Sequence, residues 1–170
     1  MSKILDAPEL NEGDPAPDFD LPLEEGRRIS LSALRGKKVA LYFYPKDNTS
    51  GCTAEAIAFN RLKRDFEAAG AVIIGVSPDS EASHKKFKSK HELDIALAAD
   101  PDKAALQAYG VWKEKSMYGR KYMGVERTTA LIGPDGRIER IWRKVKVPGH
   151  AEEVLAAVRA EASAGPFAKA

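Results

Sequence analysis

Residues 39–52 read VALYFYPKDNTSGC, and this stretch decides the fold of the chain. The apolar and aromatic run at 39–44 predicts a strand buried on both faces of a sheet. A segment with helical spacing of apolar residues follows at 53–69, and Gly70 ends it. A second apolar run at 71–76 completes a strand–helix–strand unit. Its two strands should be parallel and joined by a right-handed crossover.

Further elements flank this unit on both sides. Strand patterns with turn residues between them predict two hairpins, at 18–23 with 28–31 and at 128–132 with 138–142. A short strand is expected at 95–100. Helices are expected at 81–92, 101–109 and 149–163, with one helical turn at 32–36. Residues 111–126 match no regular element and are expected to form a long surface loop.

This order of elements predicts an α/β protein. A central mixed sheet flanked by helices, with an added N-terminal hairpin, is the layout of a thioredoxin-like fold. The length of 170 residues predicts one domain over 1–170 with a sizeable core. The ends at 1–12 and 164–170 are expected to be loose.

Composition excludes several classes of function. The formal charge is +2 with the basic residues spread out, so neither nucleic acid nor a membrane surface is an expected partner. The N-terminus lacks the apolar core of a signal peptide, and no run is long enough to span a membrane. A single cysteine excludes an intramolecular disulfide and a zinc site of several thiolates. A cytoplasmic protein with a reduced thiol is expected.

That single cysteine, Cys52, stands where the helix at 53–69 begins. Unpaired backbone N–H groups and the positive end of the helix dipole favour a thiolate there. Thr49 can turn its hydroxyl toward the sulfur or toward an oxygen bound there, and Pro45 can shape the loop and exclude water. No fixed cation is nearby in the sequence. Arg127, at the start of a predicted strand, is a candidate donor from elsewhere in the sheet.

The spacing Pro45-x-x-x-Thr49-x-x-Cys52 resembles the active-site motif of the peroxiredoxins. The run 43–53 is similar to the PrxQ, or bacterioferritin-comigratory-protein, subgroup, and the segment 115–129 resembles the same subgroup independently. The resemblance extends over about 8–162. It implies a thiol peroxidase that needs no metal or organic cofactor, and it favours a monomer.

The resemblance also implies roles for individual residues. Cys52 would be the peroxidatic cysteine, attacking hydrogen peroxide or an alkyl hydroperoxide and becoming a sulfenic acid. Arg127 would stabilise the thiolate and orient the peroxide, for which a planar cation with several donors is suited. Thr49 would hydrogen-bond the peroxide, and Pro45 would shield the sulfur. Glu55, common at this place in the subgroup, would order the start of the helix.

The chain departs from the subgroup in one respect. Many members carry a resolving cysteine five residues after the peroxidatic one, where this chain has Ile57, and others carry it in the next helix, where 81–92 has none. The expected mechanism is therefore of the 1-Cys type. Thioredoxin, glutaredoxin or a small thiol would regenerate Cys52.

Other interpretations stay open at this point. Cys52 could be an inert buried thiol, or the protein could be a peroxide sensor that does not turn over rapidly. The absence of Cys-x-x-Cys argues against a disulfide oxidoreductase. Thr49 could merely cap the helix, and Glu55 could be a helix charge. The three histidines lie on polar helices without metal-ligand spacing and are interpreted as solvated: His84, His91 and His150.

Overall fold

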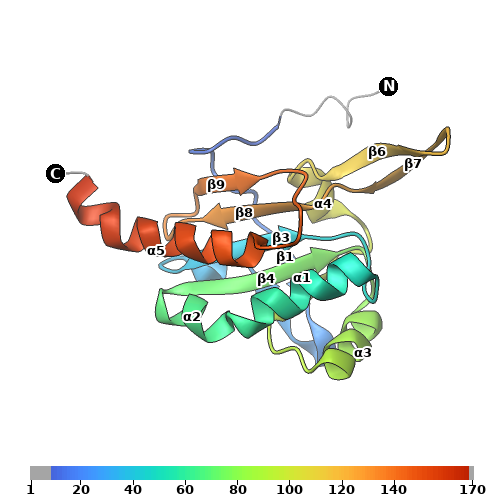
Figure 1. Ribbon diagram of the computed structural model, residues 1–170, viewed down its shortest axis with the longest axis horizontal. Coiled ribbons are helices and arrows are strands. Elements are labelled where there is room, and N and C mark those ends of the chain that lie inside the picture. Colours follow the sequence, from blue (N-terminus) through green and yellow to red (C-terminus); the bar gives the residue numbers. More distant parts are fainter. Residues whose placement is uncertain (1–8, 169–170) are drawn as a thin grey trace.

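A central five-stranded sheet organises the computed structural model, which describes residues 9–168 and side chains as far as Ala160. In spatial order its strands are β5 (Ala96–Ala99), β4 (Ala71–Ser77), β3 (Lys38–Phe43), β8 (Thr128–Ile132) and β9 (Ile138–Trp142) (Figure 1). β4 is parallel to β3 and β5, whereas β8 is antiparallel to β3 and β9. This confirms the mixed sheet of an α/β, thioredoxin-like fold.

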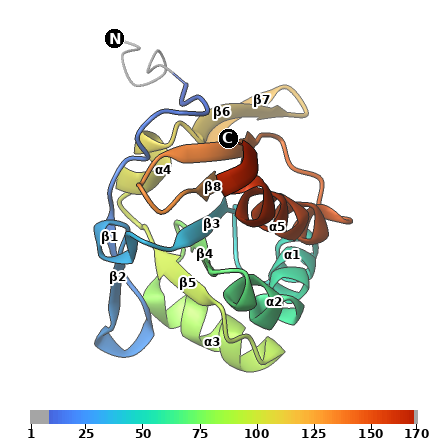
Figure 2. The same cartoon turned by 90° about the vertical axis from the view of Figure 1, so that its left-hand side faces the viewer.

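The helices cover the sheet unequally. They are α1 (Ser50–Arg61), α2 (Lys63–Ala68), α3 (Glu81–His91), α4 (Ala104–Ala108) and α5 (His150–Ala168). One face packs against α1, α2, α3 and α5 through a cluster that includes Tyr42, Phe59 and Phe87. The other face packs against α4 and the N-terminal segment through a cluster that includes Phe19 and Tyr109. Figure 2 shows α1, α2 and α5 on one side of the sheet. Leu62, with a ψ of 6°, separates α1 from α2, so the helix expected at 53–69 is two helices.

The N-terminal hairpin is confirmed. β1 (Asp20–Pro22) pairs antiparallel with β2 (Arg28–Ser30), and the 3-10 turn η1 (Glu24–Gly26) joins them. A second 3-10 turn, η2 (Ser32–Leu34), follows before β3.

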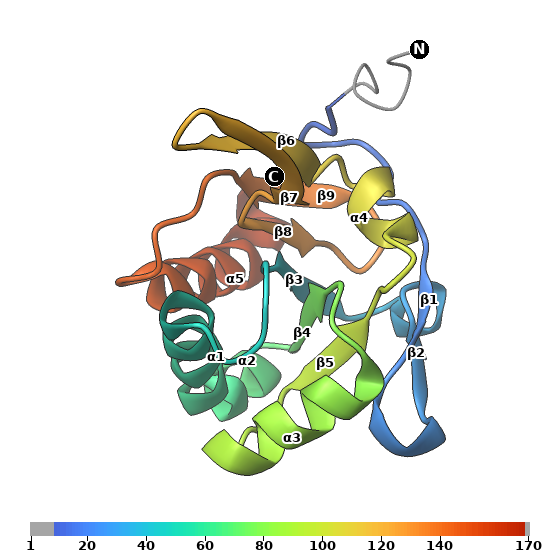
Figure 3. The same ribbon diagram turned by 90° about the vertical axis from the view of Figure 1, so that its right-hand side faces the viewer.

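The prediction of a long loop at 111–126 is wrong. This segment is an antiparallel hairpin of β6 (Trp112–Met117) and β7 (Arg120–Val125), which lies at the end of the molecule far from α3 (Figure 3). Tyr118 and Gly119 form its turn with φ of 53° and 77°, as a two-residue hairpin connection requires. Most of its side chains are exposed or half-buried on both faces. The alternation of apolar and polar residues that reveals a half-buried strand is therefore absent.

The ends expected to be loose lie partly outside the described residues, which exclude 1–8, 169 and 170. Gly13 and Ala16 hydrogen-bond the backbone of the β8–β9 hairpin, and Leu10 packs against the core. α5 extends to Ala168 instead of ending near 163. Within the described part of the chain, no helix is long and apolar enough to cross a bilayer.

Candidate active site

Cys52 lies in the first turn of α1 and is only 1% exposed. The loop 44–49 brings the chain there from the end of β3. The register of β3 with β8 pairs Phe43 with Thr128, so the residue before β8, Arg127, lies where β3 ends. The antiparallel pairing therefore brings a cation from distant sequence to the cysteine.

Arg127 contacts two acidic groups at once. Its Nη2 donates to Sγ of Cys52 at 3.4 Å, and its Nη1 donates to Oε1 of Glu55 at 2.5 Å. Burial opposes the charge of Arg127, but the Glu55 carboxylate and Cys52 outweigh burial and raise its pKa. Gly51 lies close to the guanidinium, since a Cβ built there would be in van der Waals contact with Nη2 at 3.4 Å. The arrangement holds a permanent positive charge against the sulfur.

Glu55 is a buried partner of Arg127 and not the exposed helix charge considered from the sequence. It is 1% exposed, and its Oε2 has no hydrogen-bond partner among the described residues. Burial raises its pKa to about 7, against the lowering effect of Arg127. The signal available in the sequence was its spacing from Cys52, because residues three apart share one face of a helix.

Thr49 and Pro45 bracket the loop that leads into α1. Thr49 is the N-cap residue of α1, but its side chain makes no capping bond; its Oγ1 donates to the carbonyl of Lys46 at 3.0 Å. Within the described part of the chain, no hydrogen bond joins Thr49 to Cys52. Thr49 is exposed and Pro45 is half-buried. The donor on Thr49 is occupied, so its hydroxyl oxygen remains able to accept a hydrogen bond.

Ile57 lies on the outer surface of α1 and is 41% exposed. Cys52 is the only cysteine of the chain, so the chain has no second thiol that could form a disulfide with it.

The interpretation of the histidines as solvated is wrong for two of them. His84 is 0% exposed and His150 is 4% exposed. Nε2 of His150 lies 2.8 Å from Oγ1 of Thr129, and burial lowers the pKa of His150. α3 is rich in charged residues, which concealed the inward position of the His84 ring, whereas His150 is the first residue of the amphipathic α5. His91 is half-buried with its ring edge against Phe87.

Comparisons with known proteins identify the family of the chain. The AhpC/TSA family model matches residues 12–141. A putative peroxiredoxin bcp of Coxiella burnetii is 48% identical over 146 residues, covering 86% of this chain and 97% of the relative. A mutant PrxQ of Xylella fastidiosa has a solved structure with a TM-score of 0.87 and 42% identity, covering 92% of this chain and 99% of that one.

A third relative is the bacterioferritin comigratory protein of Xanthomonas campestris, whose structures concern its alkyl peroxide reduction activity. It has a TM-score of 0.81 and 46% identity, covering 85% of this chain and 92% of that one. The family match, the curated relative and the two structures all span most of the chain. The chain belongs to the AhpC/TSA family and, within it, to the peroxiredoxins of the PrxQ or bacterioferritin-comigratory-protein group.

Proposed function

We propose that this peroxidase reduces hydrogen peroxide and alkyl hydroperoxides at Cys52, which becomes a sulfenic acid and is regenerated by an external thiol. The observation that carries the proposal is the contact of Arg127 with Sγ of Cys52 at 3.4 Å. A guanidinium held against a sulfur at a helix N-terminus favours the thiolate, which is the nucleophilic form. The alkyl peroxide reduction activity of the Xanthomonas campestris relative supports the choice of substrates.

The first step transfers one oxygen atom. The Cys52 thiolate attacks the hydroxyl oxygen of the hydroperoxide, an S–O bond forms, and the O–O bond breaks. The leaving alkoxide or hydroxide takes a proton from water and departs as alcohol or water, and the sulfur is oxidised by two electrons. Arg127 stabilises the charge that moves from sulfur to oxygen. Thr49 accepts a hydrogen bond from the peroxide hydroxyl, and Pro45 shields the sulfur from water.

Glu55 acts through Arg127. Its contact with Nη1 fixes the plane of the guanidinium, so that Nη2 points at Cys52. We therefore assign Glu55 as a positioning residue for Arg127.

The second step requires another molecule. A thiolate attacks the sulfur of Cys52–SOH, a mixed disulfide forms, and the S–O bond breaks; the leaving hydroxide takes a proton from solvent and departs as water. A second thiol then attacks the mixed disulfide and releases Cys52. Ile57 stands where many members of the group carry the resolving cysteine. The reductant is therefore thioredoxin, glutaredoxin or a small thiol. Sulfur carries both electrons throughout, so neither step calls for a metal or an organic cofactor.

The test is peroxide consumption by the wild type and by Cys52→Ser, with thioredoxin, glutaredoxin or dithiothreitol as reductant. We expect many turnovers per chain in the wild type and none in Cys52→Ser. Consumption by Cys52→Ser at the wild-type rate would contradict the role of Cys52. A wild type that stops after one equivalent of peroxide with every reductant would instead be a peroxide sensor.

We also propose that the protein acts as a monomer in the cytoplasm. A lone thiol stays reduced in that compartment, and sedimentation of the reduced chain measures the oligomeric state.

A further inference from the structure

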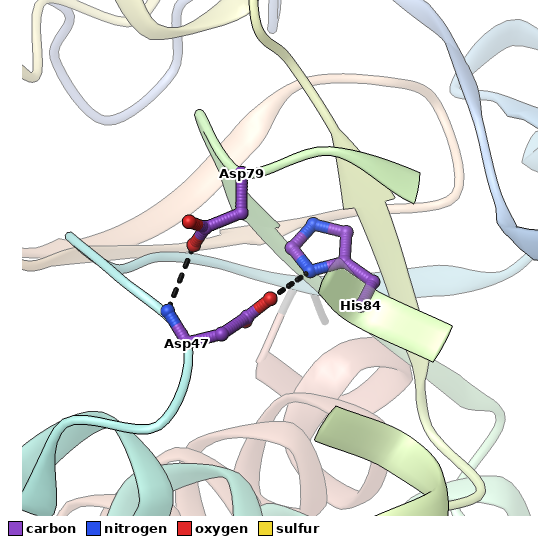
Figure 4. A group of neighbouring side chains, drawn as sticks. All are labelled: Asp47, Asp79 and His84. Carbon is purple, nitrogen blue, oxygen red and sulfur yellow. Dashed lines mark hydrogen bonds and ion pairs between the residues drawn. The ribbon is translucent and has the colours of Figure 1, made fainter. Parts of the chain in front are cut away.

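A buried group of polar side chains lies behind the loop 45–49 and is separate from the Cys52–Arg127–Glu55 contacts. Asp47 belongs to that loop, Asp79 follows β4, and His84 lies on α3; Figure 4 shows the three side chains converging. Asp47 is 4% exposed and His84 is 0% exposed. Charged groups are rarely buried so deeply unless they are paired.

Asp47 is held by four hydrogen bonds. Its Oδ1 accepts from the Tyr44 hydroxyl at 2.6 Å, and its Oδ2 accepts from Oγ of Ser83 and Nδ1 of His84, each at 2.7 Å. Its backbone N–H donates to Oδ2 of Asp79 at 2.8 Å. Asp79 also accepts from Oγ of Ser77 at the end of β4. The centre of the loop is therefore tied to β3, β4 and α3.

Hydrogen bonds hold both nitrogens of the His84 ring. Nε2 of His84 lies 3.1 Å from the carbonyl oxygen of Ala98, which only accepts, so Nε2 carries a proton. Nδ1 lies 2.7 Å from Oδ2 of Asp47 and 3.4 Å from the Tyr44 hydroxyl. Burial raises the pKa of Asp47, but hydrogen bonds and charge from His84, with hydrogen bonds from Tyr44 and Ser83, lower it overall. The His84 ring therefore ties Asp47 to α3 and to the backbone of β5.

Asp47, the loop member of the pair, lies at the middle of the loop 45–49. Asp47 is two residues from Pro45 and two from Thr49. The next residue, Asn48, has a φ of 66°, in the left-handed region that asparagine tolerates better than most residues with a side chain. Lys46 and Asn48 are exposed and contribute little packing. The inward side chain of Asp47 is therefore the main anchor of this turn.

We propose that Asp47 and His84 are positioning residues for the reaction at Cys52. Their buried hydrogen bond holds the loop 45–49, and with it Pro45 and Thr49, in one conformation where the chain enters the first turn of α1 and Cys52. This inference rests on the proposed function, and it adds to that function a residue of α3 that holds the loop 45–49 in place. Misplacing a reacting group by about 1 Å can slow a reaction by about 100-fold.

The test compares two reactions of the same thiol in Asp47→Asn, His84→Ala and His84→Asn. The first is the second-order oxidation of Cys52 by hydrogen peroxide, and the second is its alkylation by iodoacetamide at the same pH. In the proposed reaction Thr49 and Pro45 act on the peroxide, so their placement should affect oxidation of Cys52 and leave its alkylation unaffected. We expect oxidation to slow about 10- to 100-fold in Asp47→Asn and His84→Ala, with alkylation unchanged or faster. His84→Asn keeps a donor toward Asp47 and should recover part of the loss.

Two further variants complete the design. His91→Asn alters the other histidine of α3 and should leave both rates unchanged. Ser83→Ala removes one hydrogen-bond donor to Asp47, and it provides a test if the larger changes prevent folding. It should slow oxidation about 3-fold, as loss of one modest hydrogen bond would. Oxidation at the wild-type rate in the folded variants, or an equal slowing of both reactions, would overturn the inference. Neither result would affect the proposed function, which Cys52→Ser tests separately.

Discussion

Arg127 places its Nη2 3.4 Å from Sγ of Cys52, although the two residues are 75 positions apart in the chain. The contact exists because β3 and β8 are antiparallel neighbours, so that the end of one strand meets the start of the other. The same guanidinium reaches Glu55 through Nη1. One side chain thus connects Cys52 to a buried acid.

The first prediction concerns this guanidinium. Arg127→Ala should slow oxidation of Cys52 by hydrogen peroxide about 100- to 1000-fold, the range for loss of a key charge-stabilising donor. Alkylation at pH 7 should slow as well, because the thiolate population falls. Arg127→Lys keeps the charge but cannot contact Cys52 and Glu55 simultaneously, so it should be intermediate. Stopped-flow measurement of single-turnover oxidation gives the rates. Equal rates in Arg127→Ala and the wild type would remove Arg127 from the site.

The second prediction follows from the raised pKa of Glu55. A carboxyl with a pKa of about 7 in the folded state and about 4.5 in the unfolded state keeps its proton longer when folded. The folded state therefore loses stability as pH rises between these values. Glu55→Gln cannot ionise, so its free energy of unfolding relative to the wild type should rise between pH 4.5 and pH 8. The gain should be at most on the order of 3 kcal/mol.

Guanidinium denaturation of both proteins at the two pH values measures this difference. A relative loss of stability in Glu55→Gln at pH 8 would show that the ionised carboxylate is the stabilising form.

The third prediction compares two neighbouring tyrosines of the core. The Tyr42 hydroxyl is buried without a partner among the described residues, whereas the Tyr44 hydroxyl donates to Asp47 at 2.6 Å. Tyr42→Phe should be neutral or stabilising by up to about 1 kcal/mol, because it removes an unsatisfied polar group. Tyr44→Phe should be destabilising by about 1 to 3 kcal/mol, because a charged acceptor loses its donor. Denaturant midpoints of the two variants provide the comparison, and the reverse order would contradict it.

The fourth prediction concerns Ile57, which stands five residues after Cys52, where the resemblance to the group implies a resolving cysteine. The Ile57 side chain is exposed and Cys52 is buried in the same helix, so the two positions are not placed for a disulfide. In Ile57→Cys, one equivalent of peroxide should produce an intramolecular disulfide only with unwinding of the start of α1. Mass spectrometry detects the disulfide, and faster amide exchange at 50–57 detects the unwinding. A disulfide with unchanged exchange would contradict the expectation.

The central part of the fold was predictable because local pattern and tertiary packing agree there. The apolar runs that became β3 and β4 are buried on both faces, and that burial is visible as continuous hydrophobicity. The β6–β7 hairpin was not predictable in this way. Exposure on both of its faces removed the periodic signal, and its turn uses Tyr118, a residue that seldom marks such turns.

The candidate site also has residues that the sequence predicted and residues that it did not. Cys52, Thr49 and Pro45 share one short segment, and the motif identified them together. Arg127 was proposed as a donor from its place at the start of a predicted strand, and its segment also resembles the group. His84 was misinterpreted, because α3 is rich in lysine and only the fold shows that its ring lies inward beside Asp47. Side-chain pairs formed between distant segments leave no local pattern in a single sequence.

The most direct test of the whole account is the fate of Cys52 when the reduced protein meets excess hydrogen peroxide briefly, first without and then with an added thiol. Without thiol, we predict that one equivalent is consumed rapidly and that the mass of the chain rises by one oxygen atom on Cys52, which dimedone then labels. With thiol, consumption of peroxide should continue, and dimedone should then label little of Cys52. A Cys52 that stays reduced while peroxide is consumed, or one that is oxidised but never recovered by any thiol, would contradict the account.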